Sequence, residues 1–313
     1  AMTRVVTRAG ATTGRPTHCV VTGANTGIGL ETARALARTY DVVTLACRDE
    51  TRARAAMATI GADDLCDAEL RFASLDLSSL ASIEDFGRAM RAADEAIDAF
   101  VANAGVMALP TATRTRDGFE TQVGVNHLGH YAAIGWVFPL IERAGRETGD
   151  ARVVVVSSEA HRIASRGLRR DDLFGETRYG AWTQYGQSKL ANVLFANELA
   201  RRCEGRGVTV ASLHPGAVDT ELGRYLQPPD AEVKWWQKKL YNFIRKFLKT
   251  PEQGAATSVF LARDVERGVA NGKYFSDCRE KTPAKTCLDE DDALWLWNRS
   301  AELTGVAFDL ERV

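Results

Sequence analysis

Short apolar runs alternate with longer stretches of helical periodicity from residue 17 onward. The runs are rich in β-branched residues and predict strands at 18–22, 41–46, 70–75, 99–102, 152–157, 209–213 and 273–276. Between them, helical patterns occupy 28–39, 83–93, 119–143, 188–202 and 251–262. Because the strands are apolar on both faces instead of alternating, they belong in a parallel sheet covered by helices on both sides.

This alternation predicts an α/β fold, a single doubly wound Rossmann-type domain with a seven-stranded parallel sheet. The length of 313 residues suits one large α/β unit. Neither an internal repeat nor a low-complexity linker divides the chain. We therefore expect an N-terminal extension at 1–16 and one domain at 17–313.

Two segments interrupt this rhythm. Residues 159–184 carry charges and glycines and are interpreted as a loop insertion after the fifth strand. Residues 221–250 are predicted to form a helical substrate lid, in which 234–249 (KWWQKKLYNFIRKFLK) has an aromatic apolar face and a basic face. Other interpretations of 234–249 stay open: a surface helix packed on the core, a peripheral membrane contact, or an element that blocks or supplies a homodimer interface.

Composition favours a soluble globular enzyme, with 45% hydrophobic and 26% charged residues. The net charge of −1 gives no whole-chain attraction to nucleic acid, so no nucleic-acid partner is expected. No apolar run is long enough to span a bilayer, and the N-terminus lacks the apolar core of a secretory signal. We expect a cytoplasmic location, with peripheral membrane association and a removed N-terminal targeting segment both left open.

Metal binding is not expected from this sequence. The six cysteines are scattered without a CxxC pair, and no Cys/His cluster has the spacing of zinc ligands. They are interpreted as reduced thiols of a cytosolic-type compartment, with pairing of Cys278 and Cys287 left open. The histidines near the candidate site are interpreted as structural: His127, His130, His161 and His214.

Candidate chemistry begins at a glycine-rich turn. The first strand leads directly into TGANTGIG at 22–29, and a helix follows. Glycines permit a sharp turn and a close approach to pyrophosphate, while free N–H groups at the start of the helix stabilise phosphate. The turn predicts a dinucleotide site, with these cofactor-binding candidates: Gly23, Asn25, Thr26, Gly27, Ile28 and Gly29.

The spacing GxxxGxG resembles the TGxxxGxG fingerprint of the short-chain dehydrogenase/reductase family. The resemblance extends over nearly the whole chain and includes NAGVM, NHLGHY, SSEAH, YGQSK, HPGAVDT and GKYFSDC. These segments are most similar to retinol dehydrogenases and WW-domain oxidoreductase-like members. The resemblance implies a Rossmann fold, a nicotinamide cofactor and hydride transfer to or from a carbonyl carbon.

The end of the second strand indicates which nicotinamide cofactor is bound. By comparison with the family, Cys47 stands where an NAD-specific member has an acidic residue for the ribose hydroxyls, and Arg48 follows it. A guanidinium pairs well with a 2′-phosphate, so NADP(H) is the predicted cofactor. In the alternative interpretation, Arg48 points to solvent and Asp49 binds the ribose.

The resemblance implies further cofactor contacts after other strands. Asp76 resembles the adenine-contacting aspartate of the family, and Asn103 is the expected contact within the NAG turn. Pro215 and Gly216 resemble the PG turn of the family, and Thr220 its hydroxyl contact to the nicotinamide carboxamide. The implied positions are Asp76, Leu77, Asn103, Ala104, Gly105, Pro215, Gly216, Val218 and Thr220.

Tyr185 and Lys189 of YGQSK share one helix face. Tyrosine, with an ordinary pKa near 10, is a poor base at neutral pH, and a nearby ammonium is expected to lower that pKa. Ser158 follows the fifth strand, where such folds bind ligands. The resemblance implies that Ser158 binds the substrate oxygen, that Asn126 holds a water in a proton relay through Lys189, and that Lys189 fixes the nicotinamide ribose.

The predicted function is an NADP(H)-dependent oxidoreductase that interconverts a hydrophobic aldehyde or ketone and its alcohol, with a retinal/retinol-like substrate implied by the resemblance. Two alternatives stay open. One is a C=C reductase related to protochlorophyllide reductase, which shares an NHLGH-like segment and YxxxK. The other is a non-catalytic NADP-binding sensor or scaffold, which is expected to have lost a catalytic residue, and none is lost here.

Overall fold

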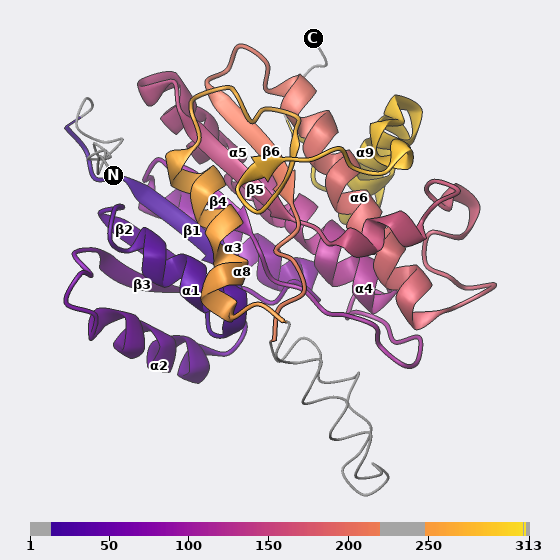
Figure 1. Cartoon of the computed structure of the whole chain (residues 1–313), viewed down its shortest axis with the longest axis horizontal. Helices are drawn as coiled ribbons and strands as arrows, with labels where there is room; N and C mark the ends of the chain where they lie inside the picture. The colour runs from indigo at the N-terminus through magenta and orange to yellow at the C-terminus, as the bar shows by residue number, and fades with distance from the viewer. Residues whose placement is uncertain (1–13, 220–247, 309, 311–313) are drawn as a thin grey trace, which may run out of the picture.

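Parallel strands form the centre of the molecule in the computed structural model, which describes residues 14–219, 248–308 and 310. They make one sheet in the order β3-β2-β1-β4-β5-β6-β7-β8 (Figure 1). Its strands are β1 (His18–Thr22), β2 (Val42–Cys47), β3 (Glu69–Ser74), β4 (Ala99–Ala102), β5 (Ala151–Val156), β6 (Val208–Leu213), β7 (Tyr274–Ser276) and β8 (Arg279–Glu280). The seven predicted strands and their parallel pairing are confirmed.

One strand of this sheet, β8, was not predicted from the sequence. β8 pairs antiparallel with β7, where Phe275 lies opposite Glu280. Both residues of β8 are charged and exposed, so no apolar run marks the strand in the sequence.

Helices cover both faces of the sheet (Figure 1). One face carries α1 (Gly27–Leu36), α2 (Glu50–Gly61) and α8 (Pro251–Val259), and the other carries α3 (Leu80–Ala93), α5 (Gly129–Thr148) and α6 (Ala181–Arg202). Successive strand residues point to opposite faces. Val21 therefore packs in the same cluster as Leu36 of α1, whereas Val20 packs in the cluster that holds Ile134 of α5. This arrangement confirms the doubly wound Rossmann-type fold.

Two predicted helices have different bounds in the structure. α6 begins at Ala181 instead of residue 188, because the buried Gln184 anchors its first turn by donating from Nε2 to the Leu173 carbonyl at 2.7 Å. The remainder of the predicted insertion contains the short 3-10 helices η3 (Glu159–Ile163) and η4 (Arg170–Asp172). α2 and the C-terminal helix α9 (Glu290–Thr304) were not among the predicted helices.

The pattern predicted as one helix over 119–143 is divided. It consists of α4 (Thr121–Val123), the π-helical turn η2 (Gly124–Leu128) and α5. A Cβ at Gly129 would lie 2.5 Å from the Leu77 carbonyl oxygen, so the helix passes very close to the chain after β3. π-turns recur at functional sites, and this one contains Asn126.

α9 and the chain after it cover the outer side of α5 and α6. Trp297 of α9 stacks on Phe195 of α6 with 6.0 Å between ring centroids, and its ring lies 4.8 Å from that of Phe308. The guanidinium of Arg202 lies 4.4 Å from the Trp297 ring, within cation–π range. This side of α5 and α6 is therefore packed within the chain itself.

Several predictions fall outside the described residues. Thr220 and most of the predicted substrate lid at 221–250, including most of 234–249, belong to 220–247. The predicted extension at 1–16 is described only from residue 14. Within the described ranges, no helix combines the length and apolar character needed to cross a membrane.

Trp297→Ala is expected to destabilise the fold by about 3–5 kcal/mol, because it removes a buried aromatic side chain. Denaturant unfolding monitored by far-UV circular dichroism measures the loss. Trp182→Ala is the control, since 45% of the Trp182 side chain is exposed and its removal should cost less than about 1 kcal/mol. Equal losses in the two variants would contradict the role given to α9.

Candidate active site

Several predicted site residues lie directly after the carboxyl ends of parallel strands. The strand order runs outward from β1 to β3 on one side and from β4 to β7 on the other, so the winding reverses between β1 and β4. Open α/β sheets bind ligands at such a switch point. Gly23 follows β1, Asn103 follows β4 and Ser158 follows β5, so the fold brings them to this one edge.

The glycine turn after β1 leaves the start of α1 uncapped. Gly23 (φ +64°) and Gly27 (φ +56°) occupy the left-handed region that favours glycine. A Cβ at Gly29 would lie 2.4 Å from Asn103 Nδ2, so a side chain there would clash. Thr26 precedes α1 without a side-chain cap, which leaves N–H groups of the first turn for an anion. Two further predicted residues of the turn are half-buried: Asn25 and Ile28.

Thr22 holds the NAG turn against β1. Its Oγ1 accepts hydrogen bonds from the backbone N–H groups of Asn103 (2.9 Å) and Ala104 (3.0 Å). The side-chain NH₂ group of Asn103 donates to the Thr22 carbonyl at 2.9 Å. The Asn103 side chain therefore fixes the turn. The sequence predicted only a cofactor contact for this residue.

The end of β2 presents the exposed guanidinium of Arg48 next to an aspartate that caps a helix. Cys47 is buried next to the backbone of the glycine turn. Arg48 is exposed. The Asp49 side chain accepts a hydrogen bond from the Arg52 backbone N–H at 2.9 Å and so caps α2. One oxygen of Asp49 is thus used to cap α2, whereas the alternative interpretation needs Asp49 to bind the ribose.

Asp76 and Leu77 follow β3 in a tight turn. Asp76 Oδ1 accepts hydrogen bonds from the Ser78 backbone N–H at 3.0 Å and the Ser78 hydroxyl at 2.7 Å. Its second oxygen lies 3.9 Å from the guanidinium of Arg116. Leu77 is buried against Gly129, at the first turn of α5. The turn is therefore held in one conformation beside η2.

Asn126 is fully buried in η2, and its side chain connects neighbouring elements. Its NH₂ group donates to the Val106 carbonyl and to Ser188 Oγ, both at 2.9 Å, and its Oδ1 accepts from the Val106 N–H at 2.8 Å. Ser188 donates in turn to the Tyr185 carbonyl at 2.8 Å. The backbone carbonyl of Asn126 lies 3.0 Å from His130 Nδ1.

Ser158 and Tyr185 are brought together by β5 and α6. Tyr185 is 4% exposed, and its hydroxyl faces the Ser158 side chain. Burial raises the pKa of Tyr185 to about 12, and the Ser158 side chain opposes that rise. This direction is opposite to the lowering expected from Lys189, because desolvation of the phenolate outweighs every opposing contribution. Tyr185 is therefore a protonated phenol at neutral pH.

Lys189 lies one helical turn further along α6. Its Nζ donates to the Val156 carbonyl at 3.1 Å and lies 5.7 Å from the centre of the Tyr185 ring. Lys189 is 3% exposed, and burial lowers its pKa to about 8. A Cβ at Gly105 would lie 3.7 Å from Nζ, so the NAG turn borders the ammonium directly.

The chain after β6 forms a fixed turn. Gly216 (φ +90°) donates its N–H to His214 Nδ1 at 3.1 Å, and the Pro215 carbonyl accepts from Lys249 Nζ at 3.2 Å. Val218 pairs with Lys249 in a parallel bridge. Because β6 pairs with β5, the turn leaves the sheet next to the chain that follows β5. Thr220, predicted to act here, lies outside the described residues.

Further polar groups, which were not predicted from the sequence, position the predicted residues. Ser157 Oγ donates to the Lys189 carbonyl at 2.7 Å, and Asn192 Nδ2 donates to the Val156 carbonyl at 3.1 Å, the same carbonyl that binds Lys189 Nζ. Ser157 and Ser188 stand inside the quoted segments SSEAH and YGQSK, so their proximity to the site was visible. Asn192 has no comparable signal, because only the packing of α6 on β5 reveals its partner.

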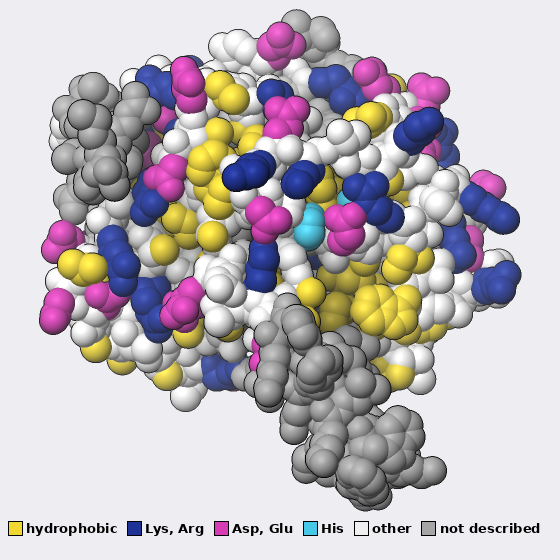
Figure 2. All heavy atoms as spheres, viewed as in Figure 1, with side chains coloured by type: hydrophobic (Ala, Val, Ile, Leu, Met, Phe, Trp, Pro, Cys, Tyr) yellow, Lys and Arg dark blue, Asp and Glu magenta, His cyan; other side chains and the backbone are white. Residues whose placement is uncertain are grey.

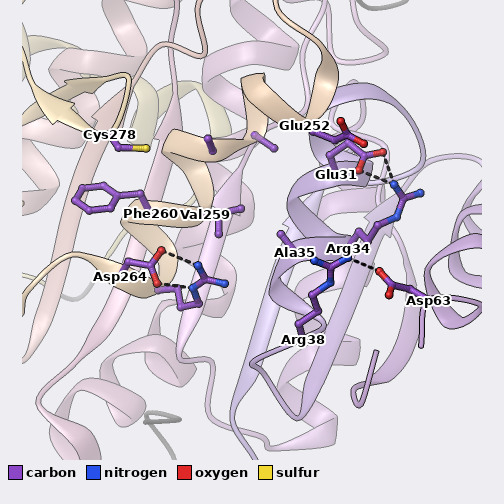
Figure 3. A pocket seen from close by; sticks show the side chains of 13 residues that line it. Glu31, Arg34, Ala35, Arg38, Asp63, Glu252, Val259, Phe260, Asp264 and Cys278 are labelled. Atoms are coloured by element: carbon purple, nitrogen blue, oxygen red, sulfur yellow. Dashed lines mark hydrogen bonds and ion pairs between the residues drawn. The ribbon is translucent and has the colours of Figure 1, made fainter. Parts of the chain in front are cut away.

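Neither a metal cluster nor the groove between α1 and α8 adds to the site within the described ranges. No cluster of three or more His, Cys, Asp or Glu side chains there could hold a metal ion. A groove of about 700 Å³ between α1 and α8 is lined by none of the predicted site residues (Figure 3). Each of its arginines has a carboxylate partner: Arg34 with Glu31, Arg38 with Asp63, and Arg263 with Asp264. Its positive charges are thus neutralised within the groove.

Apolar side chains are exposed next to Tyr185. Trp182 is 45% exposed and packs edge-on against the Tyr185 ring, with 6.1 Å between centroids. Ile163 of η3 is 46% exposed and lies against Gly186, the next residue of α6. We call Ile163 and Trp182 the apolar rim. Figure 2 shows hydrophobic side chains gathered over the region in which Figure 1 places α4.

Comparison with known proteins gives the family. A model of the short chain dehydrogenase family matches residues 17–170 and 172–231. Retinol dehydrogenase 12 of Mus musculus is 41% identical over 290 residues, which cover 93% of this chain and 87% of that protein. Retinol dehydrogenase 13 of Homo sapiens is 41% identical over 288 residues, covering 92% and 84%. The chain therefore belongs to the short-chain dehydrogenase family and is an oxidoreductase with a nicotinamide cofactor.

Solved structures agree with this fold. An uncharacterized protein from Mycobacterium paratuberculosis has a TM-score of 0.70 and 29% identity, covering 95% of this chain and 98% of that one. An actinorhodin polyketide ketoreductase with NADPH has a TM-score of 0.62 and 22% identity, covering 83% and 95%. At the latter identity the likeness supports the fold alone.

Lys189→Met is expected to stabilise the protein. Burial lowers the pKa of Lys189 from 10.5 to about 8, which corresponds to about 3 kcal/mol against the charged form in the folded chain. Methionine has a similar length and no charge, so the thermal midpoint should rise by at least about 2 °C at neutral pH. Calorimetry measures the change.

The stability gained by Lys189→Met should depend on pH. The folded chain binds the Lys189 proton less tightly than the unfolded chain does, so the penalty is complete below pH 8 and fades as the pH rises toward 10.5. The stability difference between Lys189→Met and wild type should shrink over that range. Lys273→Met, at an exposed ion pair with Glu280, is the control and should change little. A variant less stable than wild type at neutral pH would contradict the account.

Proposed function

We propose that this protein is an NADP(H)-dependent oxidoreductase that interconverts a hydrophobic aldehyde or ketone and its alcohol. The observation that carries the proposal is the buried Tyr185 phenol next to the Ser158 side chain, with the buried Lys189 one helical turn away. Carbonyl reduction requires three groups from a protein: a phenol that donates a proton, a hydroxyl that binds the substrate oxygen, and an ammonium that returns a proton to the phenol. The similarity to retinol dehydrogenases supports an apolar carbonyl substrate.

The residues of the glycine turn and β2 fit a phosphorylated dinucleotide. The uncapped start of α1 suits a pyrophosphate, and the close approach at Gly29 suits a backbone that must lie against it. Arg48 is exposed at the end of β2, whereas Asp49 is engaged as the cap of α2, which favours a 2′-phosphate over a free ribose hydroxyl. When bound, the nicotinamide supplies or accepts the hydride.

The proton steps follow from the two buried groups. Burial keeps Tyr185 protonated well above neutral pH, so the residue is ready to donate its proton to a carbonyl oxygen that Ser158 orients. Lys189, with a pKa of about 8, still carries most of its charge at pH 7 and returns a proton toward Tyr185. The Asn126 carbonyl is the group that would hold the water connecting Lys189 to solvent. Oxidation of the alcohol reverses these steps and requires the Tyr185 phenolate, so a rise in pH favours oxidation.

The apolar rim supports a hydrophobic substrate. Ile163 and Trp182 expose apolar surface beside the buried Tyr185, and surface of this kind near a reacting group is typical of a site for an apolar ligand. A retinal-like aldehyde fits this description. The sequence retains all four predicted catalytic residues, Asn126, Ser158, Tyr185 and Lys189, which argues against a non-catalytic sensor.

Tyr185→Phe is expected to lower kcat/KM for NADPH-dependent reduction by at least about a hundredfold, because it removes the proton donor and little else. The assay follows NADPH oxidation with all-trans-retinal and a series of aliphatic and aromatic aldehydes and ketones. Tyr179→Phe is the matched control, since the Tyr179 hydroxyl donates to the Leu109 carbonyl. Wild-type activity in Tyr185→Phe would overturn the proposed mechanism, and an inactive wild type would overturn the proposed function.

Arg48→Ala is expected to raise the KM for NADPH about tenfold or more, because it removes a charge-assisted contact to the 2′-phosphate. The KM for NADH should stay near that of wild type. Arg54→Ala, which breaks an exposed ion pair with Glu50 on α2, is the control for a general loss of positive charge. Equal effects on NADPH and NADH would contradict the role given to Arg48.

A further inference from the structure

His130 connects two parts of the candidate site that are distant in the sequence. It lies at the start of α5 and is 1% exposed. Its Nδ1 lies 3.0 Å from the Asn126 carbonyl oxygen, and its Nε2 lies 2.9 Å from Thr22 Oγ1 at the end of β1. Both ring nitrogens are therefore within hydrogen-bond distance of a partner in the site.

The chemistry of these partners determines the tautomer of the ring. A carbonyl oxygen can only accept a hydrogen bond, so Nδ1 must carry the proton that it donates to Asn126. Burial keeps the imidazole of His130 neutral and lowers its pKa to about 4. Nε2 therefore has a lone pair and accepts a hydrogen bond from the Thr22 hydroxyl.

The Thr22 hydroxyl is suited to this bond. Its oxygen already accepts the backbone N–H groups of Asn103 and Ala104, which leaves its single proton to be donated. Two acceptors are near it: His130 Nε2 at 2.9 Å and the Val101 carbonyl at 3.4 Å. The shorter distance favours His130. One continuous series of hydrogen bonds then runs from the NAG turn through Thr22 and His130 to Asn126.

We propose that His130 is a positioning residue that fixes the Asn126 carbonyl relative to the cofactor turn. The proposal rests on the proposed function, because it assigns a use to this carbonyl in the proton relay. Asn126 is tied to Ser188, which directly precedes Lys189. A displacement of the NAG turn would therefore move the Asn126 carbonyl through His130. It would also move the surroundings of the Lys189 ammonium, because the same turn lies next to Nζ at Gly105.

His127 supplies a matched control on the same helical segment. It is equally buried, at 1% exposure, and its Nε2 lies 2.8 Å from Ser300 Oγ of α9. Glutamine at either position keeps a polar side chain and loses the geometry of the ring. His130→Gln perturbs the Asn126 carbonyl, whereas His127→Gln perturbs a contact that does not lead to the site.

Steady-state kinetics of NADPH-dependent aldehyde reduction test the inference. For His130→Gln we expect kcat to fall by about tenfold to a hundredfold while the KM for NADPH changes by less than about threefold. The solvent deuterium isotope effect on kcat should increase, because the proton steps become slower. His127→Gln should keep the wild-type values for both. An unchanged kcat and isotope effect in His130→Gln, or equal losses in the two variants, would overturn the proposal.

A measurement on the wild-type chain keeps the inference separate from the proposed function. Nitrogen-15 NMR of the histidine rings, with His130 assigned through its Cβ, should show a protonated Nδ1 and an unprotonated Nε2 from neutral pH down to about pH 5. A proton on Nε2 would overturn the bridge whether or not the protein is active. An inactive wild type with the expected tautomer would instead overturn the proposed function and leave the bridge supported.

Discussion

The buried ammonium of Lys189 is the constraint on which the geometry of the site depends. A charge removed from water is strongly destabilising unless protein groups replace its hydration. Here Nζ donates to the Val156 carbonyl at 3.1 Å, next to the Tyr185 ring and directly against the NAG turn at Gly105. β5, α6 and the chain after β4 must therefore meet within a few ångströms. The contacts that make the burial of this charge tolerable also fix the place where a substrate oxygen would receive its proton.

The parallel sheet explains why these groups converge. The carboxyl ends of β1, β4 and β5 lie at one edge, so the glycine turn, the NAG turn and Ser158 become neighbours although the sequence separates them widely. Polar side chains then join one strand end to the next, as Thr22 does for the NAG turn and Asn126 for α6. Buried polar groups linked in this way hold a unique arrangement, because any displacement leaves a donor or acceptor without its partner. A preorganised site follows from ordinary hydrogen-bond requirements.

The fold was predictable because a doubly wound sheet demands strands that are apolar on both faces, and those runs are plain in the sequence. The strong motifs likewise located the glycine turn and the pair of Tyr185 and Lys189. Two kinds of feature were not predictable. β8 is short, charged and exposed, so it leaves no periodic signal. The engagement of Asp49 as a helix cap and the raised pKa of Tyr185 depend on local geometry and burial, which no motif encodes. The role of His130 was likewise not predictable, because its hydrogen-bond partners are known only once β1 and α5 are packed together.

The central claim is that this site transfers hydride to the carbon of an apolar carbonyl group while Tyr185 protonates the oxygen. The most direct test is a single-turnover reaction of the wild-type protein with all-trans-retinal and NADPH deuterated at both C4 positions, followed by mass spectrometry and NMR of the product. The account predicts an alcohol with one deuterium on the carbinol carbon and a hydroxyl proton taken from solvent. Deuterium on a carbon of a reduced C=C bond, or bound NADPH with no labelled product, would contradict it.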